Sequence, residues 1–111
     1  MVTSNREVSN YLDRYRLDIN ILKRYERRLR RGELNSTITA KKEAAEAEML
    51  EIEQTIAAVP NPASREILEL YYIDLLSYEE IAERLEIKEK TAAGRRAHAL
   101  KYVTLPNREE G

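Results

Sequence analysis

The stretch Ser77–Val103, SYEEIAERLEIKEKTAAGRRAHALKYV, decides the fold of the chain. Ser77 is followed three residues later by Glu80, which is the spacing of a capping box. In that motif each of the two side chains accepts a hydrogen bond from the other residue's backbone N–H, so a helix starts there. Apolar residues then recur at helical spacing, at Ile81, Ala82 and Leu85. The pattern predicts a short helix that begins at Ser77.

A second helix is predicted from about Glu89 to Val103, after a short turn over residues 86–88. Its inner side carries apolar residues, namely Ala92, Ala99, Leu100 and Val103. Its other faces carry Lys90, Arg95, Arg96, His98 and Lys101. Two helices joined by so short a turn, with the small Ala82 where they cross, predict a helix-turn-helix. Such a motif places its second helix in the major groove of DNA.

Two residues of this stretch depart from the usual pattern. The turn position that is most often glycine is Glu86, where a positive φ is a strain for glutamate. Gly94 lies inside the second helix, where glycine costs roughly 1 kcal/mol relative to alanine. Gly94 therefore marks either a close backbone approach, such as one to DNA, or a tolerated surface position, and both interpretations stay open.

The net charge of −1 conceals a strong segregation of charge along the chain. Residues 6–31 hold nine Lys or Arg and four Asp or Glu, whereas residues 33–86 hold four basic and thirteen acidic residues. Residues 88–103 hold five basic residues and one acidic residue. A local basic face attracts phosphates whatever the overall charge, so the second helix of the motif is suited to nucleic acid.

The first 59 residues predict an antiparallel helical hairpin. Its first helix is expected from Ser4, which forms a second capping box with Glu7, to about Arg31, with Gly32 as the stop. Its second helix is expected from about Thr39 to Val59. Both helices carry heptad-like apolar stripes, with Val8, Leu12, Tyr15, Ile19, Leu22 and Leu29 on the first and Ala45, Met49, Ile52, Ile56 and Val59 on the second. The polar Asn35-Ser36-Thr37 is interpreted as a loop and helix start.

Several apolar residues lie outside these stripes, namely Tyr11, Ile21, Tyr25 and Leu50. Because a two-helix hairpin buries little by itself, we expect this surface to pack on the C-terminal domain or on a second copy of the chain. Packing within the monomer alone is the alternative. The hairpin, residues 1–59, is accordingly expected to mediate oligomerisation, most simply a homodimer, or to bind another partner.

The hairpin is expected to end at Val59-Pro60-Asn61-Pro62. Asn61 can cap a third helix, with Pro62 in its first turn, that runs to about Asp74. Tyr71 and Tyr72 are expected in the core between this helix and the helix-turn-helix. Period-2 runs are absent, so the expected fold is all-α: the hairpin, a helix-turn-helix domain over residues 60–105 and a tail over residues 106–111.

Five arginines cluster where the first helix is expected to end, at Arg24, Arg27, Arg28, Arg30 and Arg31. Cations suit a helix C-terminus, and charge runs are usually solvated or paired. We therefore interpret the cluster as a solvated helix end. The alternative is a phosphate-contacting patch beside the DNA-binding helix.

Residues 59–103 resemble region 4 of bacterial RNA polymerase sigma factors. The resemblance rests on residues 65–72, REILELYY, and residues 76–82, LSYEEIA, which are similar to the family's REVLELRY and LSYEEIAE helices. Thr91-Ala92 stands where the family's recognition helix begins, and Arg95 matches an arginine of the smaller sigma factors. The segment that holds the melted promoter has no counterpart, so a working sigma factor is not expected. In length and plan the chain is similar to small phage regulators of the ArpU type.

The resemblance implies a recognition helix over residues 89–103 that contacts double-stranded DNA, and RNA polymerase as a second partner. Lys90, together with Glu89, would meet base edges, and Ala93 would contact a thymine methyl group. Phosphates would be held by Lys88, Thr91, Arg95, Arg96 and Lys101, with His98 as a phosphate contact or a surface residue. Ala93 and Gly94 offer no hydrogen-bonding side chain. Recognition of a particular DNA sequence is therefore expected to require two copies of the chain or sequence-dependent DNA shape. Otherwise the chain is expected to bind DNA only loosely.

An enzyme is not expected, and neither is a cofactor or metal site. The chain has one histidine, no cysteine and three scattered glycines, which leaves no nucleophile–base pair and no phosphate loop. No signal peptide or membrane span is predicted, which favours the cytoplasm. The leading interpretation is a phage-type transcription regulator. The alternatives are a packaging protein of the small-terminase type that forms a ring, and a protein-interaction module that has lost DNA binding.

Overall fold

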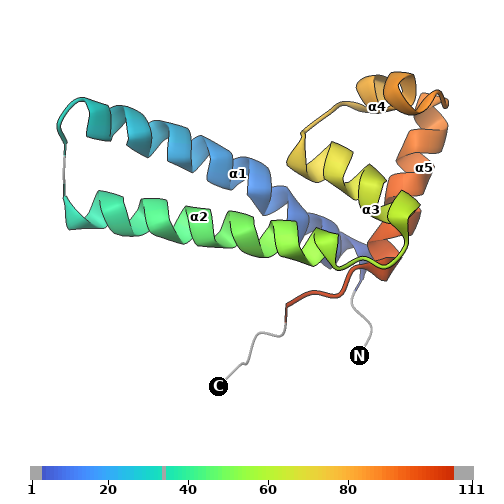
Figure 1. Ribbon diagram of the computed structural model, residues 1–111, viewed down its shortest axis with the longest axis horizontal. Helices are drawn as coiled ribbons and strands as arrows, with labels where there is room; N and C mark the ends of the chain where they lie inside the picture. The colour runs from blue at the N-terminus through green and yellow to red at the C-terminus, as the bar shows by residue number, and fades with distance from the viewer. Residues whose placement is uncertain (1–3, 34, 107–111) are drawn as a thin grey trace.

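The computed structural model describes residues 4–33 and 35–106, and within them the chain forms only helices and their connections. Figure 1 shows two long antiparallel helices, with a compact group of shorter helices at one end of the pair. The elements are α1 (Asn5–Arg30), α2 (Ser36–Ala57), α3 (Pro62–Leu68), the π-helix η1 (Glu69–Ile73), α4 (Tyr78–Leu85), α5 (Glu89–Ala99) and the 3-10 helix η2 (Leu100–Tyr102). The predicted all-α class and helical hairpin are confirmed. Residues 107–111 of the predicted tail lie outside the described residues.

The caps of the hairpin explain where its helices begin and end. Ser4 and Glu7 form the predicted capping box at the start of α1, and Gly32 follows the helix with a φ of +84°. Helix α2 begins at Ser36, three residues before the predicted start. The reason is that the Asn35 side chain accepts a hydrogen bond from the Ile38 N–H at 2.8 Å, so Asn35 serves as the cap.

The third predicted helix divides into two forms. Asn61 caps α3 by accepting from the Ser64 N–H at 3.0 Å, with Pro62 in the first turn, as expected. The last turn before Asp74 is a π-helix, η1, which the sequence pattern did not indicate. Its wider turn is closed by a hydrogen bond from the Asp74 N–H to the Glu69 carbonyl at 2.9 Å. The π-helix carries Tyr71 and Tyr72, and Tyr72 is buried in the core.

One hydrophobic core joins the base of the hairpin to the C-terminal helices. It combines Val8, Leu12, Tyr15, Ile52 and Ile56 with Ile67, Leu68, Tyr72, Ile81, Ala92, Ala99 and Leu100. Tyr11, one of the apolar residues outside the stripes, packs against this core as well. The boundary predicted after Val59 therefore lies within a shared core. The contact with the C-terminal helices is made mainly by stripe residues of α1 such as Val8 and Leu12, and of the off-stripe residues expected to pack there only Tyr11 joins it.

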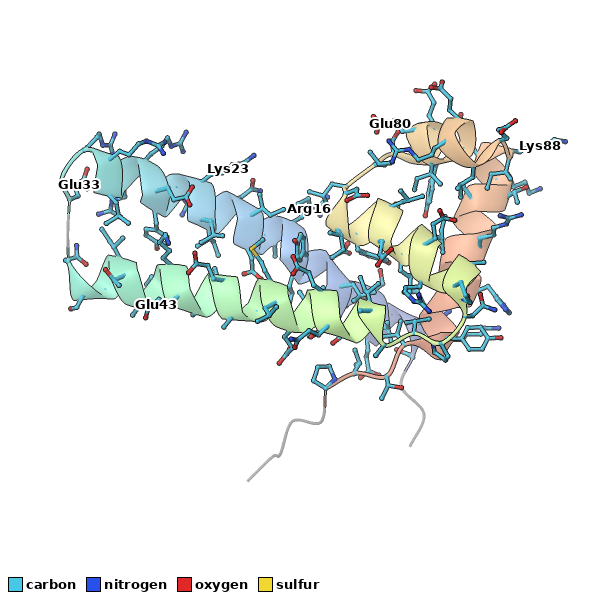
Figure 2. The ribbon with its side chains drawn as sticks, viewed as in Figure 1. Arg16, Lys23, Glu33, Glu43, Glu80 and Lys88 are labelled. Atoms are coloured by element: carbon cyan, nitrogen blue, oxygen red, sulfur yellow. The ribbon has the colours of Figure 1, made fainter. Side chains whose placement is uncertain are left out.

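The other half of the hairpin forms an arm that extends away from the C-terminal helices (Figure 1). Along the hairpin, Leu17 of α1 and Leu50 of α2 are each about half exposed, at 53% and 54%. The arginine cluster lies at its far end, where Arg28 and Arg31 pair with Glu33. Figure 2 shows Glu33 at the tip of the arm and Lys88 at the opposite end of the molecule. The alternative of a phosphate patch beside the recognition helix is therefore wrong for this cluster.

A buried carboxyl group interrupts the seam between α1 and α2. Asp18 is 5% exposed, and its Oδ2 atom has no hydrogen-bond partner among the described residues. Burial, together with hydrogen bonding to Glu48 and the charge of that residue, raises the pKa of Asp18 to about 7. Arg14, which pairs with Glu48 at 2.7 Å, opposes this rise through its charge.

The raised pKa makes the stability of the hairpin depend on pH. Between the unfolded-state pKa of about 3.9 and about 7, the folded chain keeps a proton that the unfolded chain has lost. The free energy of unfolding therefore falls as the pH rises through this window. The Asp18→Asn variant should raise the free energy of unfolding at pH 8 by at least about 1 kcal/mol and change it little at pH 4.

Urea unfolding of the wild type and of Asp18→Asn, each at pH 4 and at pH 8, measures this difference in the free energy of unfolding. Glu43→Gln, which removes an exposed carboxylate of α2, is the matched control and should show no such contrast. An equal effect of Asp18→Asn at pH 4 and pH 8 would show that folding does not raise the pKa of Asp18.

Candidate nucleic-acid interface

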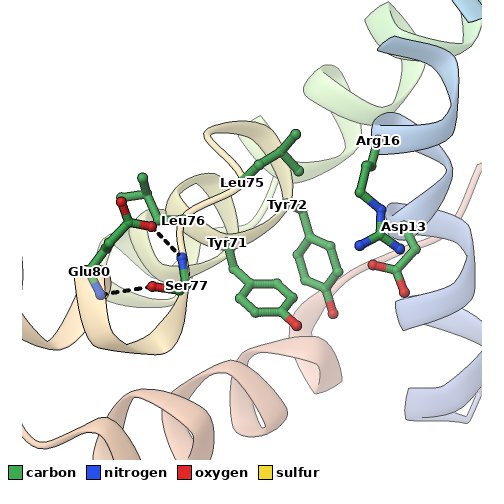
Figure 3. A pocket seen from close by; sticks show the side chains of 8 residues that line it. All are labelled: Asp13, Arg16, Tyr71, Tyr72, Leu75, Leu76, Ser77 and Glu80. Carbon is green, nitrogen blue, oxygen red and sulfur yellow. Dashed lines mark hydrogen bonds between the residues drawn. The ribbon is translucent and has the colours of Figure 1, made fainter. Parts of the chain in front are cut away.

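The first helix of the motif, α4, begins as the sequence predicts. The Ser77 Oγ accepts from the Glu80 N–H at 3.1 Å, and the Glu80 carboxylate accepts from the Ser77 N–H at 2.8 Å. Figure 3 shows this reciprocal pair beside Tyr71 and Tyr72. Hydrogen bonding to Ser77 also lowers the pKa of Glu80. The cap aligns α4 so that Ile81 and Ala82 are buried, as expected.

The turn between α4 and α5 adopts the conformation that the sequence makes costly. Glu86 has a φ of +56°, in the left-handed region where glycine is the usual residue. The Ile87 N–H donates to the Ala82 carbonyl at 2.9 Å and closes the end of α4. Helix α5 then starts after Lys88, with Ala92 fully buried against the other helices. The chain thus forms the predicted helix-turn-helix.

Helix α5, with its cap residue Lys88 and with Lys101 of η2, presents most of the predicted contact residues on an exposed surface. The exposed ones are Lys88, Glu89, Lys90, Thr91, Gly94, Arg95, His98 and Lys101, whereas Ala93 is half-buried. The α-helix ends at Ala99, before the predicted Val103, and continues as the 3-10 helix η2. Figure 2 shows Lys88 at the outer edge of the molecule, where α5 begins. Four of the exposed residues are Lys or Arg and one is an acid, so this surface of α5 has a net positive charge.

A groove of about 340 Å³ runs between this surface and α3. Arg95, His98 and Gly94 line it from α5, and Ser64 and Ile67 line it from α3. The His98 ring lies against Tyr102, whose hydroxyl is 3.3 Å from the His98 Nε2. Arg95 and His98 therefore share one side of α5, while Lys90 and Lys101 continue the exposed surface beyond them.

Arg96 differs from the prediction because it points into the molecule. Its Nε donates to the Tyr78 hydroxyl at 2.5 Å, and its Nη1 donates to the hydroxyl of Tyr72 and, at 3.4 Å, to that of Ser9. The guanidinium carbon also lies 4.8 Å from the centre of the Tyr71 ring. These contacts engage Nε and Nη1 of Arg96 within the protein, so this placement does not fit the predicted phosphate contact.

Sequence reasoning missed the residues of α1 that lie beside α5. The Asn5 side chain donates to the Ala97 carbonyl at 3.0 Å, and Arg6 and Asn10 line a shallow groove with Ala97 and Leu100. The Asn5–Ala97 pair is separated by 92 positions in the chain. No periodicity or spacing signals a contact over such a separation. The only available sign was the excess of polar and basic residues in a segment predicted to be a hairpin.

Comparison with known families assigns the class of this motif. Residues 49–103 match the family described as sigma-70, region 4. This part of the chain is therefore sigma region 4-like, and that family consists of DNA-binding helix-turn-helix domains. The match begins within α2, before the boundary predicted after Val59. Searches of curated proteins and of solved structures gave no match.

Among the described residues, no helix is both long and apolar enough to span a lipid bilayer. The His, Asp and Glu side chains of the same residues form no group of three that could bind a metal ion.

Substitution of Gly94 tests whether the side of α5 that bears this residue is free of contacts with the rest of the protein. A Cβ atom at this position would meet nothing within 4 Å, so the protein itself does not require glycine here. Gly94→Ala should raise the free energy of unfolding by about 0.5–1 kcal/mol, because alanine is the better helix former. Thermal and urea unfolding would measure the gain.

Gly32→Ala provides the contrasting control, since Gly32 has a positive φ that alanine adopts only with strain. That variant should be destabilised. A loss of stability in Gly94→Ala would mean that the side of α5 bearing Gly94 is packed against the protein after all.

Proposed function

We propose that the chain is a DNA-binding transcription regulator of the phage type, with α5 as the recognition helix in the major groove. The observation that carries the proposal is the exposed cationic surface along α5, which the burial of Ala92 and Ala99 leaves facing outward. A helix-turn-helix holds such a surface at a fixed angle to its supporting helix. The proposal also draws on the likeness of residues 49–103 to sigma region 4.

The roles within the site follow from exposure. Lys90 and Glu89 reach base edges, with Ala93 against a thymine methyl group. Backbone phosphates are held by Lys88, Thr91, Arg95 and Lys101, with His98 at the edge of the same surface. Arg96 is left out of this set because its donors are engaged within the protein. A single copy has few base-reading side chains, so sequence choice relies on two copies or on DNA shape.

The salt dependence of DNA binding tests this assignment. Each cation that neutralises a phosphate contributes about 0.9 to the slope of log affinity against log salt concentration. Arg95→Ala and Lys101→Ala should each reduce the slope by about one and weaken binding at low salt. Fluorescence anisotropy with a labelled duplex, selected from random sequences, at several salt concentrations measures both quantities.

Arg27→Ala is the matched control, because it removes one exposed cation from the far tip of the hairpin. Its slope should equal that of the wild type. If Arg95→Ala, Lys101→Ala and Arg27→Ala all gave the wild-type slope, α5 would be ruled out as the DNA contact and a protein-interaction module would be favoured. In the same assay, weaker DNA binding by Gly94→Ala would indicate that DNA approaches the backbone closely at Gly94. Unchanged binding would indicate that Gly94 is an ordinary surface residue.

We further propose that the hairpin arm pairs two copies of the chain, so that two recognition helices act together. Leu17 of α1 and Leu50 of α2 are each about half exposed, so each long helix presents an apolar side chain that the monomer does not cover. Residues 6–31 carry a net charge of +5 and α2 is acidic, so α1 of one copy complements α2 of another. RNA polymerase is the second partner that the sigma-like domain suggests, and the arm leaves that domain free to meet it.

Sedimentation equilibrium would test the pairing. Leu50→Gln should weaken the dimer about tenfold or more, because burial of a leucine contributes roughly 1.5–3 kcal/mol. Leu75→Gln, which alters an exposed leucine outside the arm, should leave the association unchanged. A strictly monomeric chain would exclude the arm as a self-association surface, whereas a closed assembly of many copies would favour the packaging alternative.

A further inference from the structure

A single guanidinium group connects four elements of the fold. Arg96 belongs to α5, and its partners are Ser9 of α1, Tyr72 of η1 and Tyr78 of α4. The ring of Tyr71 lies against the guanidinium on one side and stacks on Tyr78, with ring centres 5.1 Å apart. The hydroxyls of Ser9 and Tyr72 are 2.9 Å apart and bond to each other as well. The network therefore closes on itself around Arg96.

The chemistry of this network requires arginine. All of the contacts just described are with neutral hydroxyls and aromatic rings, so the positive charge is held without a carboxylate. Hydrogen bonds from a charged donor are stronger than those between neutral groups, and stacking on aromatic rings adds to the stabilisation. The planar group donates from Nε and Nη1 in fixed directions, whereas a lysine ammonium is a compact point charge that cannot span the same acceptors.

A second contact ties α5 to α1 at the neighbouring residue. The Asn5 side chain donates to the Ala97 carbonyl, next to Arg96 in the chain. Helix α1 runs without interruption from Asn5 to Arg30, so the segment that contacts α5 also forms one side of the projecting arm. A helix of that length is a stiff element, and a displacement of the arm therefore acts directly on α5.

We propose that Arg96 is a positioning residue that fixes the orientation of α5 relative to the hairpin, so that the recognition helix and the arm move as one rigid body. A partner that binds the arm would then set the placement of the recognition helix, and a dimer formed through the arms would set the spacing of two such helices. This consequence for DNA rests on the proposed function. The role of Arg96 in fixing the orientation of α5 does not depend on the proposed function.

The absence of cysteine in the sequence makes a direct distance measurement straightforward. Spin labels on Glu43→Cys in α2 and Lys90→Cys in α5 report the orientation of the arm relative to the recognition helix; both sites are exposed. The otherwise unchanged chain should give one narrow distance distribution by pulsed electron paramagnetic resonance, recorded on chains diluted with unlabelled protein. Adding Arg96→Lys should broaden that distribution at least twofold.

Tyr78→Phe removes one acceptor and leaves the charge in place, so it provides a milder variant if Arg96→Lys does not fold. It should broaden the distribution in the same direction. Tyr25→Phe, which removes a hydroxyl from the arm outside the network, is its matched control and should change nothing. Ile38→Val controls for stability, because it trims a buried residue of α2 far from Arg96.

The positioning role is overturned if Arg96→Lys or Tyr78→Phe lowers the melting temperature yet leaves the distance distribution as narrow as Ile38→Val does. The DNA assay gives an independent outcome. Arg96→Lys should weaken binding about tenfold with an unchanged salt slope, since its charge is kept and no phosphate contact is lost. A slope reduced by about one in Arg96→Gln would instead make Arg96 a phosphate contact and overturn the proposal. If no chain binds DNA, the proposed function fails while the distances still decide the role of Arg96.

Discussion

The burial of the first half of α1 against the C-terminal helices is the contact on which the rest of the structure depends. A hairpin of two helices has one narrow apolar seam and cannot supply a sufficient core alone. Val8 and Leu12 extend the core of the hairpin because they pack in one cluster with Tyr72 and Leu100. All four side chains are almost fully buried. Each contributes on the order of 1.5–3 kcal/mol through burial. The same contact sets the direction in which the arm leaves the helix-turn-helix.

Charge is separated in space as well as along the chain. Basic side chains at the tip of the arm are paired or solvated, as Arg28 and Arg31 with Glu33 illustrate. The acidic α2 lies along the basic α1, and the ion pair between Arg14 and Glu48 joins them. The cations of α5 that remain exposed lie at the other end of the molecule (Figure 2). A net charge near zero therefore coexists with a locally positive α5, because the acidic residues are concentrated in other segments of the chain.

Two residues hold left-handed backbone conformations at the corners of the motif. Glu86 has a φ of +56° and Leu75 a φ of +58°, and side chains in this region cost roughly 1–2 kcal/mol. Both corners are closed by hydrogen bonds, from Ile87 to the Ala82 carbonyl and from Leu76 to the Leu70 carbonyl. Packing of α4 against its neighbours offsets the strain, which lets a chain without glycine at either corner keep the geometry of a helix-turn-helix.

The amino-acid sequence by itself determined the helices, their caps and the exposed cationic surface of α5. Those features arise from contacts between residues at most four positions apart, such as the Ser77–Glu80 capping box, or from apolar residues that recur every three or four positions. Tertiary structure alone decided the π-helix, the union of the hairpin with the C-terminal core and the inward direction of Arg96. The reason is that a basic side chain on a helix has the same local pattern whether it faces solvent or the protein. Only the approach of Ser9, Tyr72 and Tyr78, from distant parts of the chain, turned Arg96 from an expected phosphate contact into the centre of a partly buried network.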